Sequence, residues 1–596
     1  MCGICGSYKI NGQVDRKPAT DMVHRIAHRG PDEILSYDIA NLSVKTARLT
    51  MTGLHNGWQP CISSNSRFIC MANGEIFNAR DLIREYGLNV GHNLSDIAVI
   101  PEIIANFGIE GLSLIDGQFA AAIYDSKLDE LLLMRDRFGI CPLYYSERNG
   151  TIHFCSELKP LVQSVEGSWS LDLEAVDQYF SLGNIVAPVT IVSEVRSIKP
   201  GSVIIFSKSS PLGASEHYWR YGLFNTDDNF PSSTSLRDSL VESVSSRMAA
   251  EVEIGSYLSG GLDSTALAIL ARRELQHPLS TFSSTTPGSS IDESKYQKIV
   301  VNQYDIEHHE VPCTPSDIHD LLEQSIRHCC APQRETYNVA ALQLSRSVNA
   351  HGIKGVISGE GADELFYGYD SYLFDHAGKK THAEDARNKS AWGRSDFSWE
   401  VNWDNIEKRK KLYLNNSYFN NCADMEFWKR RLIPFSDAEV KDLTLLQMRS
   451  IADVYVQLSG HLLGDHGDAM VMNHSVEGRY PFLSNSIVEF VLRCPDEQKI
   501  ENFETKAILK KAVRGLIPDE IIDRGKQGFT SPSLSLNEAF SDDRVAYWRQ
   551  LVDSAKIFNT SAVLADFGKT NEKWDFALSA ISIAIIVDEL KLEVEV

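Results

Sequence analysis

Long apolar runs are missing from this chain of 596 residues, and their absence excludes one broad class of protein. A helix that spans a membrane needs about 20 consecutive apolar residues. No stretch of the sequence approaches that length. The best candidate, residues 577–587, is short and is interrupted by Ser579 and Ser582. We therefore expect no membrane span and predict a buried helix at this place.

A surplus of positive charge is also missing. The chain has 58 Lys and Arg residues against 80 Asp and Glu residues, which gives a formal net charge of -22 at pH 7. This balance disfavours a nucleic-acid-binding surface, because such surfaces neutralise phosphates with Lys and Arg. It leaves room for a local basic pocket that binds a nucleotide.

Cysteines in a metal-binding or disulfide pattern are lacking as well. The 11 cysteines are scattered and odd in number, and no CxxC motif is followed by a second one. This distribution favours reduced thiols over a disulfide framework or a zinc–thiolate site. The first residues contain neither a charged region nor an apolar region typical of a signal peptide. Together these features predict a cytoplasmic protein.

The length of the chain exceeds what a single hydrophobic core usually supports, so we expect two domains. Polar stretches that contain Pro and Ser, at residues 208–213 and 225–234, are typical of loops and linkers. We place the boundary near residue 210, within about ten residues either way. The expected domains are therefore 1–210 and 211–596.

The chain is organised around Ser-Gly-Gly-Leu-Asp-Ser at residues 259–264. The mostly apolar residues 252–258 predict a strand, and the Ala- and Leu-rich residues 265–271 predict a helix. A Gly-Gly turn between the two lets the backbone approach a ligand closely, and the amides at a helix start attract an anion. The alternative is a glycine-rich turn that binds nothing.

Two features distinguish this loop from the Walker phosphate loop. No Gly-Lys-Ser/Thr follows it. Asp263 would repel a bare phosphate, so its presence indicates pyrophosphate bound together with Mg²⁺. Ser259 and Ser264 add hydroxyl donors. We therefore expect an ATP site that releases pyrophosphate.

A second candidate segment follows another predicted strand. Residues 279–283 and 355–357 are strand-like, with helical stretches between them, which predicts a mostly parallel sheet. Ligands of such sheets bind at the carboxyl ends of the strands. Ser-Gly-Glu-Gly-Ala-Asp-Glu, residues 358–364, begins at one of these ends.

This segment crowds three carboxylates around a glycine-containing turn. Crowded carboxylates repel one another, and a metal ion stabilises them. We assign Asp363, together with Asp263, to Mg²⁺, and Glu360 to the reacting centre. For Glu364 the alternative is a solvated acidic residue favoured by the helix dipole.

Cys2 is a candidate nucleophile. If Met1 is removed, Cys2 carries a free α-amine whose pKa is about 7.7–8.0. Such an amine can accept the thiol proton, so that nucleophile and base belong to one residue. Taken alone, a cysteine at position 2 by chance is the simpler interpretation.

Further residues make this region a candidate glutaminase. A bound α-amino acid needs a guanidinium for its carboxylate, which Arg48 would supply. Its ammonium needs carboxylates, and Glu75 and Asp96 would supply them. The tetrahedral oxyanion needs amide donors, which the Asn73 side chain and the Gly74 N–H would supply.

Four motifs in this region resemble the class II, N-terminal-nucleophile glutamine amidotransferase domain. They are Met-Cys-Gly-Ile-Cys-Gly at 1–6, His-Arg-Gly-Pro-Asp at 28–32, Asn-Gly-Glu-Ile-Phe-Asn at 73–78, and Arg-Asp-Arg-Phe-Gly followed by Pro-Leu-Tyr-Tyr within 135–145. Together with residues 259–264 they resemble the glutamine-hydrolysing asparagine synthetase family. The likeness covers nearly the whole chain and is weakest at about 370–445.

The resemblance implies a fold and a set of substrates. The fold is an αββα N-terminal-nucleophile hydrolase sandwich, followed by a parallel-sheet α/β domain of the adenine-nucleotide α-hydrolase (PP-loop) type with extra helices. The substrates are glutamine, ATP and aspartate or another carboxylate, with Mg²⁺ as cofactor. No nucleic-acid or membrane partner is implied, and a homodimer is compatible with it.

The resemblance also implies residue roles. Cys2 is the nucleophile, Asn73 and Gly74 form the oxyanion hole, and Lys506 reaches the α-phosphate. Arg479 is expected to be structural, pairing with Glu477 or across a domain contact. Residues 524–532 complete the match. The expected ATP and pyrophosphate site comprises Leu258, Ser259, Gly260, Gly261, Leu262, Asp263, Ser264, Ser283, Ser358 and Gly359.

Departures from the family pattern keep alternatives open. Cys141 stands where the family usually has a basic residue, Ala47 where it often has His, and Ser484 where it has Asp; we expect Ser484 to cap a helix. Cys-Cys-Ala-Pro at 329–332 stands where relatives often carry Asp-Glu-Pro, which raises amidation of a different carboxylic acid. A non-catalytic regulator and a sugar-phosphate amidotransferase are less favoured, because the expected nucleophile and pyrophosphate loop are both present.

Overall fold

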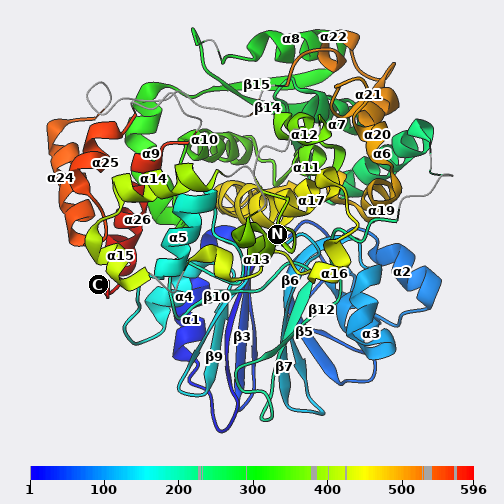
Figure 1. Ribbon diagram of the computed structural model, residues 1–596. Helices are drawn as coiled ribbons and strands as arrows, with labels where there is room; N and C mark the ends of the chain where they lie inside the picture. The colour runs from blue at the N-terminus through cyan, green and yellow to red at the C-terminus, as the bar shows by residue number, and fades with distance from the viewer. Residues whose placement is uncertain are drawn as a thin grey trace.

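The computed structural model describes residues 2–225, 230, 232–289, 291–377, 385–399, 402–422, 426–526, 528, 540–568 and 574–595. Two six-stranded antiparallel sheets form one half of the molecule, and a five-stranded parallel sheet with many helices forms the other (Figure 1). This is the combination of α+β and α/β layers that the sequence predicts.

The first antiparallel sheet contains the start of the chain. Its strands, in spatial order, are β10 (Arg196–Ser197), β8 (Tyr144–Arg148), β9 (Thr151–Cys155), β1 (Gly3–Lys9), β3 (Leu42–Arg48) and β2 (Glu33–Asp38). The strand β1 alternates its side chains between two cores: Ile4 packs between the sheets, and Cys5 packs against the outer helices. Those outer helices are α1 (Lys17–Arg25) and α4 (Leu158–Ser164).

The second antiparallel sheet lies against the inner face of the first. Its strands, in spatial order, are β12 (Ala214–His217), β11 (Ser202–Phe206), β7 (Glu130–Arg135), β6 (Gly117–Asp125), β5 (Phe68–Ile76) and β4 (Cys61–Ile62). Met71 packs inward between the sheets, and its neighbour Ala72 packs outward against α2 (Ala79–Tyr86) and α3 (Val99–Phe107). The resulting order of layers is helix, sheet, sheet, helix. β12 belongs to this sheet although it follows residue 210, near which the sequence places the domain boundary.

The parallel sheet has the strand order β15 (Ile306–Pro312), β14 (Leu279–Thr285), β13 (Ile254–Tyr257), β16 (Gly355–Ile357) and β17 (Glu477–Arg479). The predicted strands at 279–283 and 355–357 are confirmed. Helix α7 (Leu262–Arg273) follows β13 and confirms the strand–turn–helix prediction around residues 259–264. The carboxyl ends of β13 and β16 are adjacent, because the two strands pair in parallel.

Helices surround this sheet and fill the rest of the second half. They are α5 (Leu173–Leu182), α6 (Ser233–Met248), α8 (Ser294–Gln303), α9 (Pro315–Cys329), α10 (Tyr337–Ala350), α11 (Ala362–Phe366), α12 (Asp370–His376), α13 (Ala386–Trp392), α14 (Trp403–Tyr413), α15 (Asn416–Cys422), α16 (Asp437–Val440), α17 (Leu445–Ala452), α18 (Ala469–Met472), α19 (Asn485–Arg493), α20 (Asp496–Lys499), α21 (Ala507–Val513), α22 (Asp519–Ile522), α24 (Asp542–Ser554), α25 (Thr560–Asp566) and α26 (Phe576–Leu590). A short 3-10 helix, η1 (Ala27–Arg29), lies in the first half and precedes β2.

A π-helical segment, η5 (Asp453–Asp468), joins α17 to α18, so that residues 445–472 form one continuous helix. The helix lies near the centre of the molecule, where Figure 1 shows α17 in yellow. A π-helix of this length is rare, and π-helical turns are frequent near functional sites.

Helix α26 contains residues 577–587 and is almost fully buried, which confirms the helix predicted there. Within the described parts of the chain, no helix is both long and apolar enough to cross a bilayer. Ser484 lies at the N-cap position of α19, but its side chain caps no backbone amide. The expectation that its hydroxyl caps the helix is therefore wrong; the hydroxyl lies 3.4 Å from that of Ser486 instead.

Buried ion pairs hold the two halves together. Arg29 of η1 forms two hydrogen bonds to Asp468 of η5, of 2.7 and 2.8 Å, and both side chains are at most 1% exposed. Arg247 of α6 pairs with Asp116 in the same bidentate manner. Bidentate geometry fixes orientation as well as distance, so these pairs position the halves relative to each other.

Candidate active sites

Cys2 lies immediately before β1 and is only 6% exposed. Its nitrogen donates a hydrogen bond of 2.7 Å to Oδ1 of Asn73 on β5, and its carbonyl accepts one of 3.0 Å from Nε of Arg29. The thiol points toward the carbonyl of Leu49, at 3.7 Å. Burial raises the pKa of the Cys2 thiol, so ionisation of this thiol requires a nearby base.

Asn73 and Gly74 lie in the middle of β5, next to the Cys2 nitrogen. The Nδ2 atom of Asn73 is buried and has no hydrogen-bond partner among the described residues. A buried amide donor without a partner is costly, so this atom is suited to an acceptor on a ligand. Gly74 has φ +149°, and a Cβ there would lie 2.1 Å from the Gln118 carbonyl; no other residue fits.

Glu75 and Asp96 lie beside Asn73 and Gly74. Asp96 accepts a hydrogen bond of 2.5 Å from the Ile76 amide. Burial raises the pKa of Asp96 to about 6. Burial, then the charge of Asp96, raises the pKa of Glu75 well above its ordinary value, although Arg479 opposes this. Two carboxylates with raised pKa values form a site that favours a cation.

Arg48, at the end of β3, contacts residues other than these two carboxylates. Its guanidinium donates to the carbonyl of Gly53 at 3.2 Å and lies 3.5 Å from Glu33, which is half exposed. Both contacts are long, and Glu33 is half exposed, so a ligand carboxylate can replace Glu33. The structure thus brings Cys2, Asn73, Gly74, Glu75 and Asp96 together, and places Arg48 near them through β3 and its loop.

Arg479 and Glu477 are contributed to this site by the other half of the chain. Arg479 donates a hydrogen bond of 2.7 Å to Glu477 and lies 3.4 Å from Glu75. Both pairings that the sequence suggested for Arg479 are present at once. The position of Glu477 beside Glu75 was missed, because nothing in the local sequence connects residues so far apart.

The second site is the loop between β13 and α7. Hydrogen bonds among its serines shape it: the Ser264 hydroxyl accepts from the Ser259 amide at 3.1 Å, and the Ser259 hydroxyl accepts from the Gly261 amide at 3.2 Å. Gly260 has φ +79°, and a Cβ there would lie 2.8 Å from the side chain of Tyr296. These bonds hold the turn before the first amides of α7.

Neighbouring strands support this loop. The Leu258 amide donates to the carbonyl of Phe282 at 3.0 Å, and the Ser283 hydroxyl donates to the Leu258 carbonyl. The Ser283 side chain therefore supports the loop by binding the loop's backbone. Arg524 donates to the Gly260 carbonyl at 2.8 Å and also pairs with Glu293. Of the motif at 524–532, residues 527 and 529–532 lie outside the described residues.

Lys506 connects two carboxylates at the start of two helices. Its ammonium lies 2.6 Å from Asp263 of α7 and 2.7 Å from Asp363 of α11. Burial would lower the pKa of Lys506, but the two carboxylates outweigh it and raise that pKa. Lys526 lies 2.5 Å from Asp363 on the other side. The sequence named Lys526 only as part of a motif and missed this contact.

Ser358, Gly359 and Glu360 follow β16 and meet the loop at Asp263. The Ser358 amide donates to the Arg479 carbonyl at 2.9 Å. A Cβ on Gly359 would lie 3.2 Å from that of Asp263, so the two segments are in close contact. The Oε2 atom of Glu360 is buried without a hydrogen-bond partner among the described residues, and burial raises the pKa of this carboxyl.

Glu364 differs from the solvated alternative considered for it. The residue is 1% exposed and accepts a hydrogen bond of 2.6 Å from the Tyr369 hydroxyl. Burial raises the pKa of Glu364 to about 8. Helix α11 is short and packs into the core, and this is why its first turn is not solvated.

Sequence models of two known families match most of the chain. A sequence model of the glutamine amidotransferase domain matches residues 1–219, and a sequence model of asparagine synthase matches residues 235–583, which is more than half of the chain.

Individual relatives agree with these matches. Asparagine synthetase [glutamine-hydrolyzing] 1 of Bacillus subtilis is 27% identical over 567 residues, covering 89% of this chain and 87% of the relative. Asparagine synthetase B [glutamine-hydrolyzing] of Escherichia coli is 30% identical over 413 residues, covering 65% and 68%. The amidase chyE of Penicillium rubens is 25% identical over 612 residues, covering 89% of each chain.

The sequence motifs, the two layered halves and the extent of these matches agree with one another, and the chain belongs to the asparagine synthase family, as a glutamine-hydrolysing, asparagine synthetase-like amidotransferase.

Proposed function

We propose that this enzyme hydrolyses glutamine at Cys2 and transfers the ammonia to a carboxylate that ATP has activated as an acyl-adenylate. The observation that carries the proposal is the position of Lys506, held between Asp263 and Asp363 beside the 259–264 loop. A buried cation at the start of α7 is suited to a polyphosphate whose charge changes during reaction. We propose residues 1–210 as the glutaminase domain and 211–596 as the synthetase domain.

At the glutaminase site, the Cys2 thiolate attacks the side-chain carbonyl carbon of glutamine. Once Met1 is removed, the nitrogen that now donates to Asn73 is an α-amine of the same residue and takes the thiol proton. The unpartnered Asn73 Nδ2 and the Gly74 N–H donate to the oxyanion. Ammonia leaves, and water releases glutamate from the thioester.

The substrate's charged ends fit the surrounding residues. Glu75 and Asp96 attract the α-ammonium, which would lower the raised pKa values of both carboxyls. Arg48 exchanges its long contact with Glu33 for the α-carboxylate. Glutamine therefore binds with its side-chain amide toward Cys2.

At the synthetase site, an oxygen of the acceptor carboxylate attacks the α-phosphorus of ATP, and pyrophosphate leaves. Ammonia then attacks the acyl carbon, and AMP leaves as the amide forms. Leu258, Ser259, Gly260, Gly261, Leu262 and Ser264, with Ser283, Ser358 and Gly359 behind them, form the proposed pyrophosphate cradle. Lys506 stabilises negative charge at the α-phosphate, and Glu360 lies at the reacting centre with an oxygen free for a proton or an amine.

Mg²⁺ fits the carboxylates of this site. The Oδ1 atom of Asp263 is buried and has no hydrogen-bond partner among the described residues. An orphaned carboxylate oxygen of this kind is a ligand that Mg²⁺ prefers. Asp263 and Asp363 would hold the ion, which would neutralise charge on the departing pyrophosphate.

We propose aspartate as the acceptor, which would make the product asparagine. Two observations favour a second candidate, a different carboxylic acid in specialised metabolism. The relative named amidase chyE covers as much of the chain as the B. subtilis synthetase does, and Cys329–Pro332 departs from the pattern of asparagine-forming relatives.

The deciding experiment is mass spectrometry of the products formed from a panel of carboxylic acids with ATP, Mg²⁺ and glutamine. We expect asparagine, AMP and pyrophosphate in equal amounts when aspartate is present. An absence of asparagine at millimolar aspartate, together with an amide from another acid, selects the second candidate. ATP that is not converted to AMP with any acid contradicts the proposed synthetase chemistry.

A further inference from the structure

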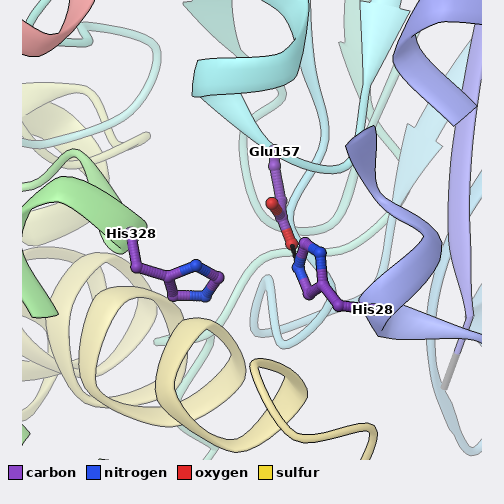
Figure 2. Close-up of side chains that lie close together, drawn as sticks. All are labelled: His28, Glu157 and His328. Atoms are coloured by element: carbon purple, nitrogen blue, oxygen red, sulfur yellow. Dashed lines mark hydrogen bonds and ion pairs between the residues drawn. The ribbon is translucent and has the colours of Figure 1, made fainter. Parts of the chain in front are cut away.

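Three side chains that can bind a metal ion meet where the two halves of the molecule touch. His28 belongs to η1, Glu157 precedes α4, and His328 lies in the last turn of α9. Figure 2 shows the two imidazoles and the carboxylate gathered in one place from these separate segments. We propose that His28, Glu157 and His328 bind a divalent transition-metal ion, Zn²⁺ above all, and that this ion links the two halves.

The distances suit such a site. One ligand atom from each residue lies within 4.8 Å of those of the other two. Nε2 of His28 lies 2.8 Å from Oε1 of Glu157. Zn²⁺ binds nitrogen and oxygen ligands at about 2.0–2.2 Å, so the ligand atoms around one ion lie roughly 3–4 Å apart. Small side-chain rotations reach this spacing.

His328 is oriented as metal-binding histidines usually are. Its Nε2 atom lies 3.0 Å from the carbonyl oxygen of Ala469. A carbonyl oxygen only accepts, so Nε2 carries the hydrogen, and Nδ1 of the neutral ring keeps its lone pair. A hydrogen bond from the ring nitrogen that does not bind the metal fixes the tautomer of a ligating imidazole.

The charge balance leaves a negative charge for an ion. Arg29 lies 3.2 Å from Glu157, but both of its terminal nitrogens also bind the buried Asp468, at 2.7 and 2.8 Å. Asp468 therefore offsets the guanidinium. The negative charge of Glu157 is therefore left for an ion.

An ion can enter from a cavity. Glu157 and His328 both line a cavity of about 190 Å³ between the two halves, together with Asp468. This volume holds several water molecules. With three protein ligands, two imidazoles and one carboxylate, the fourth position would be taken by water from the cavity. Imidazole and carboxylate ligands suit Zn²⁺ and neighbouring first-row ions rather than Mg²⁺ or Ca²⁺.

The competing interpretation is a contact held by hydrogen bonds alone, with His28 donating to Glu157. The two interpretations differ in what the protein does with added metal. An ion would also bridge η1 and α4 of the first half to α9 of the second, so it would stabilise their association.

The test uses the full-length chain, stripped of metal with a chelator, in a Cys2→Ala background. That background removes the Cys2 thiol, so that no rival chelate of thiol and amine can form at the start of the chain. Competition with a chromophoric chelator measures Zn²⁺ binding, and the visible spectrum of Co²⁺ reports the ligand type. We expect one Zn²⁺ per chain, visible Co²⁺ bands without a near-ultraviolet thiolate band, and a rise in the unfolding temperature with Zn²⁺.

Variants assign the site. Loss of an outer-shell partner alone weakens metal binding about 10- to 100-fold, so His28→Gln and His328→Gln, which remove ligands, should weaken it by more. His309→Gln is the matched control. The centre of its ring lies 4.0 Å from that of the His351 ring, and its Nε2 lies 3.6 Å from Oε1 of Glu307. His309 thus also has a histidine and a glutamate as neighbours, but lies outside the proposed site.

Several results overturn the proposal. They are no stoichiometric Zn²⁺ binding in the parent protein, binding that both ligand variants retain, and a Co²⁺ spectrum with a thiolate band. The parent protein supplies the first and third readouts without any ligand variant, so a variant that fails to fold leaves the test intact. None of these readouts depends on glutamine or ATP turnover.

Discussion

The guanidinium of Arg479, on the parallel sheet, lies 3.4 Å from the carboxylate of Glu75 on the antiparallel sheet. The backbone carbonyl of Arg479 also accepts from the amide of Ser358, in the segment that reaches Asp263. One residue thus contacts both candidate sites. Its side chain contacts Glu75 of the first site, and its main chain contacts Ser358 of the second.

Arg479→Gln should weaken glutamine binding. Burial and Asp96 raise the pKa of Glu75, and Arg479 opposes them; without Arg479 that pKa rises further, which disfavours the ionised carboxylate that attracts an ammonium. Because a hydrogen bond to a charged group is worth about 1.5–3 kcal/mol, we expect KM for glutamine to rise at least about tenfold. Steady-state glutaminase kinetics measure this, and Arg479→Lys, which keeps the charge, should show a smaller rise. An unchanged KM in a folded Arg479→Gln protein contradicts the assignment of Glu75.

Cys2→Ala should abolish amide synthesis from glutamine and retain synthesis from added ammonia. The thiol is the proposed nucleophile of the first site only, and the residues proposed to hold ATP lie in the other half. Product formation with glutamine and with ammonium chloride, measured side by side, gives the comparison. Loss of both activities in a folded variant would show that the two sites are not separate.

Asn73→Ala should lower kcat for glutamine hydrolysis by about 10²–10³ with little change in KM, the effect of losing one oxyanion donor. Its Nδ2 has no hydrogen-bond partner among the described residues. The substitution therefore removes a hydrogen bond that forms only with the oxyanion of the transition state. Ammonia-dependent synthesis by the same preparation is the control. A change confined to KM would argue that Asn73 positions Cys2 and does not stabilise the oxyanion.

Glutamine binding should weaken as the pH falls through about 6. Burial raises the pKa of Asp96 to about 6, and only the ionised carboxyl attracts the substrate ammonium, so each further unit of pH costs up to about tenfold in affinity. Calorimetry on the inactive Cys2→Ala protein measures the dissociation constant directly, free of the chemistry. With Asp96→Asn added, glutamine should bind weakly and its dissociation constant should not change with pH. A dissociation constant that does not change between pH 7 and pH 5 in the protein that keeps Asp96 would falsify the assignment.

Lys506→Ala should stop pyrophosphate release and spare glutaminase activity. The variant removes the cation between Asp263 and Asp363, and losing one such group at a transition state costs about 10²–10³ in kcat. Leaving buried carboxylates unpaired costs about 3–5 kcal/mol of stability, although Lys526 still contacts Asp363. Pyrophosphate and glutamate are therefore measured on one preparation, whose glutaminase activity reports that the first half is folded. An unaltered pyrophosphate yield means that Lys506 is not in the reacting site.

Much of the fold could be predicted because its signals are local. The strand–turn–helix around residues 259–264 follows from an apolar run, two glycines and an Ala-rich run, and the structure has it as β13 and α7. The buried helix at 577–587 follows in the same way from a short apolar run. The exceptions are also local. Ser484 and Glu364 have the residue types of a cap and a solvated helix start, but packing around α19 and α11 gives them other partners.

By itself, the sequence determined which segments form strands and helices and which chemical groups stand at their ends, because backbone preferences and hydrophobic periodicity act over a few residues. Only the tertiary structure decided that Arg479 reaches Glu75, that Asp468 binds Arg29, and that His328 lies beside His28. These partners are hundreds of residues apart. Periodicity tells which face of an element is buried, but the packing of two cores against each other decides what that face meets.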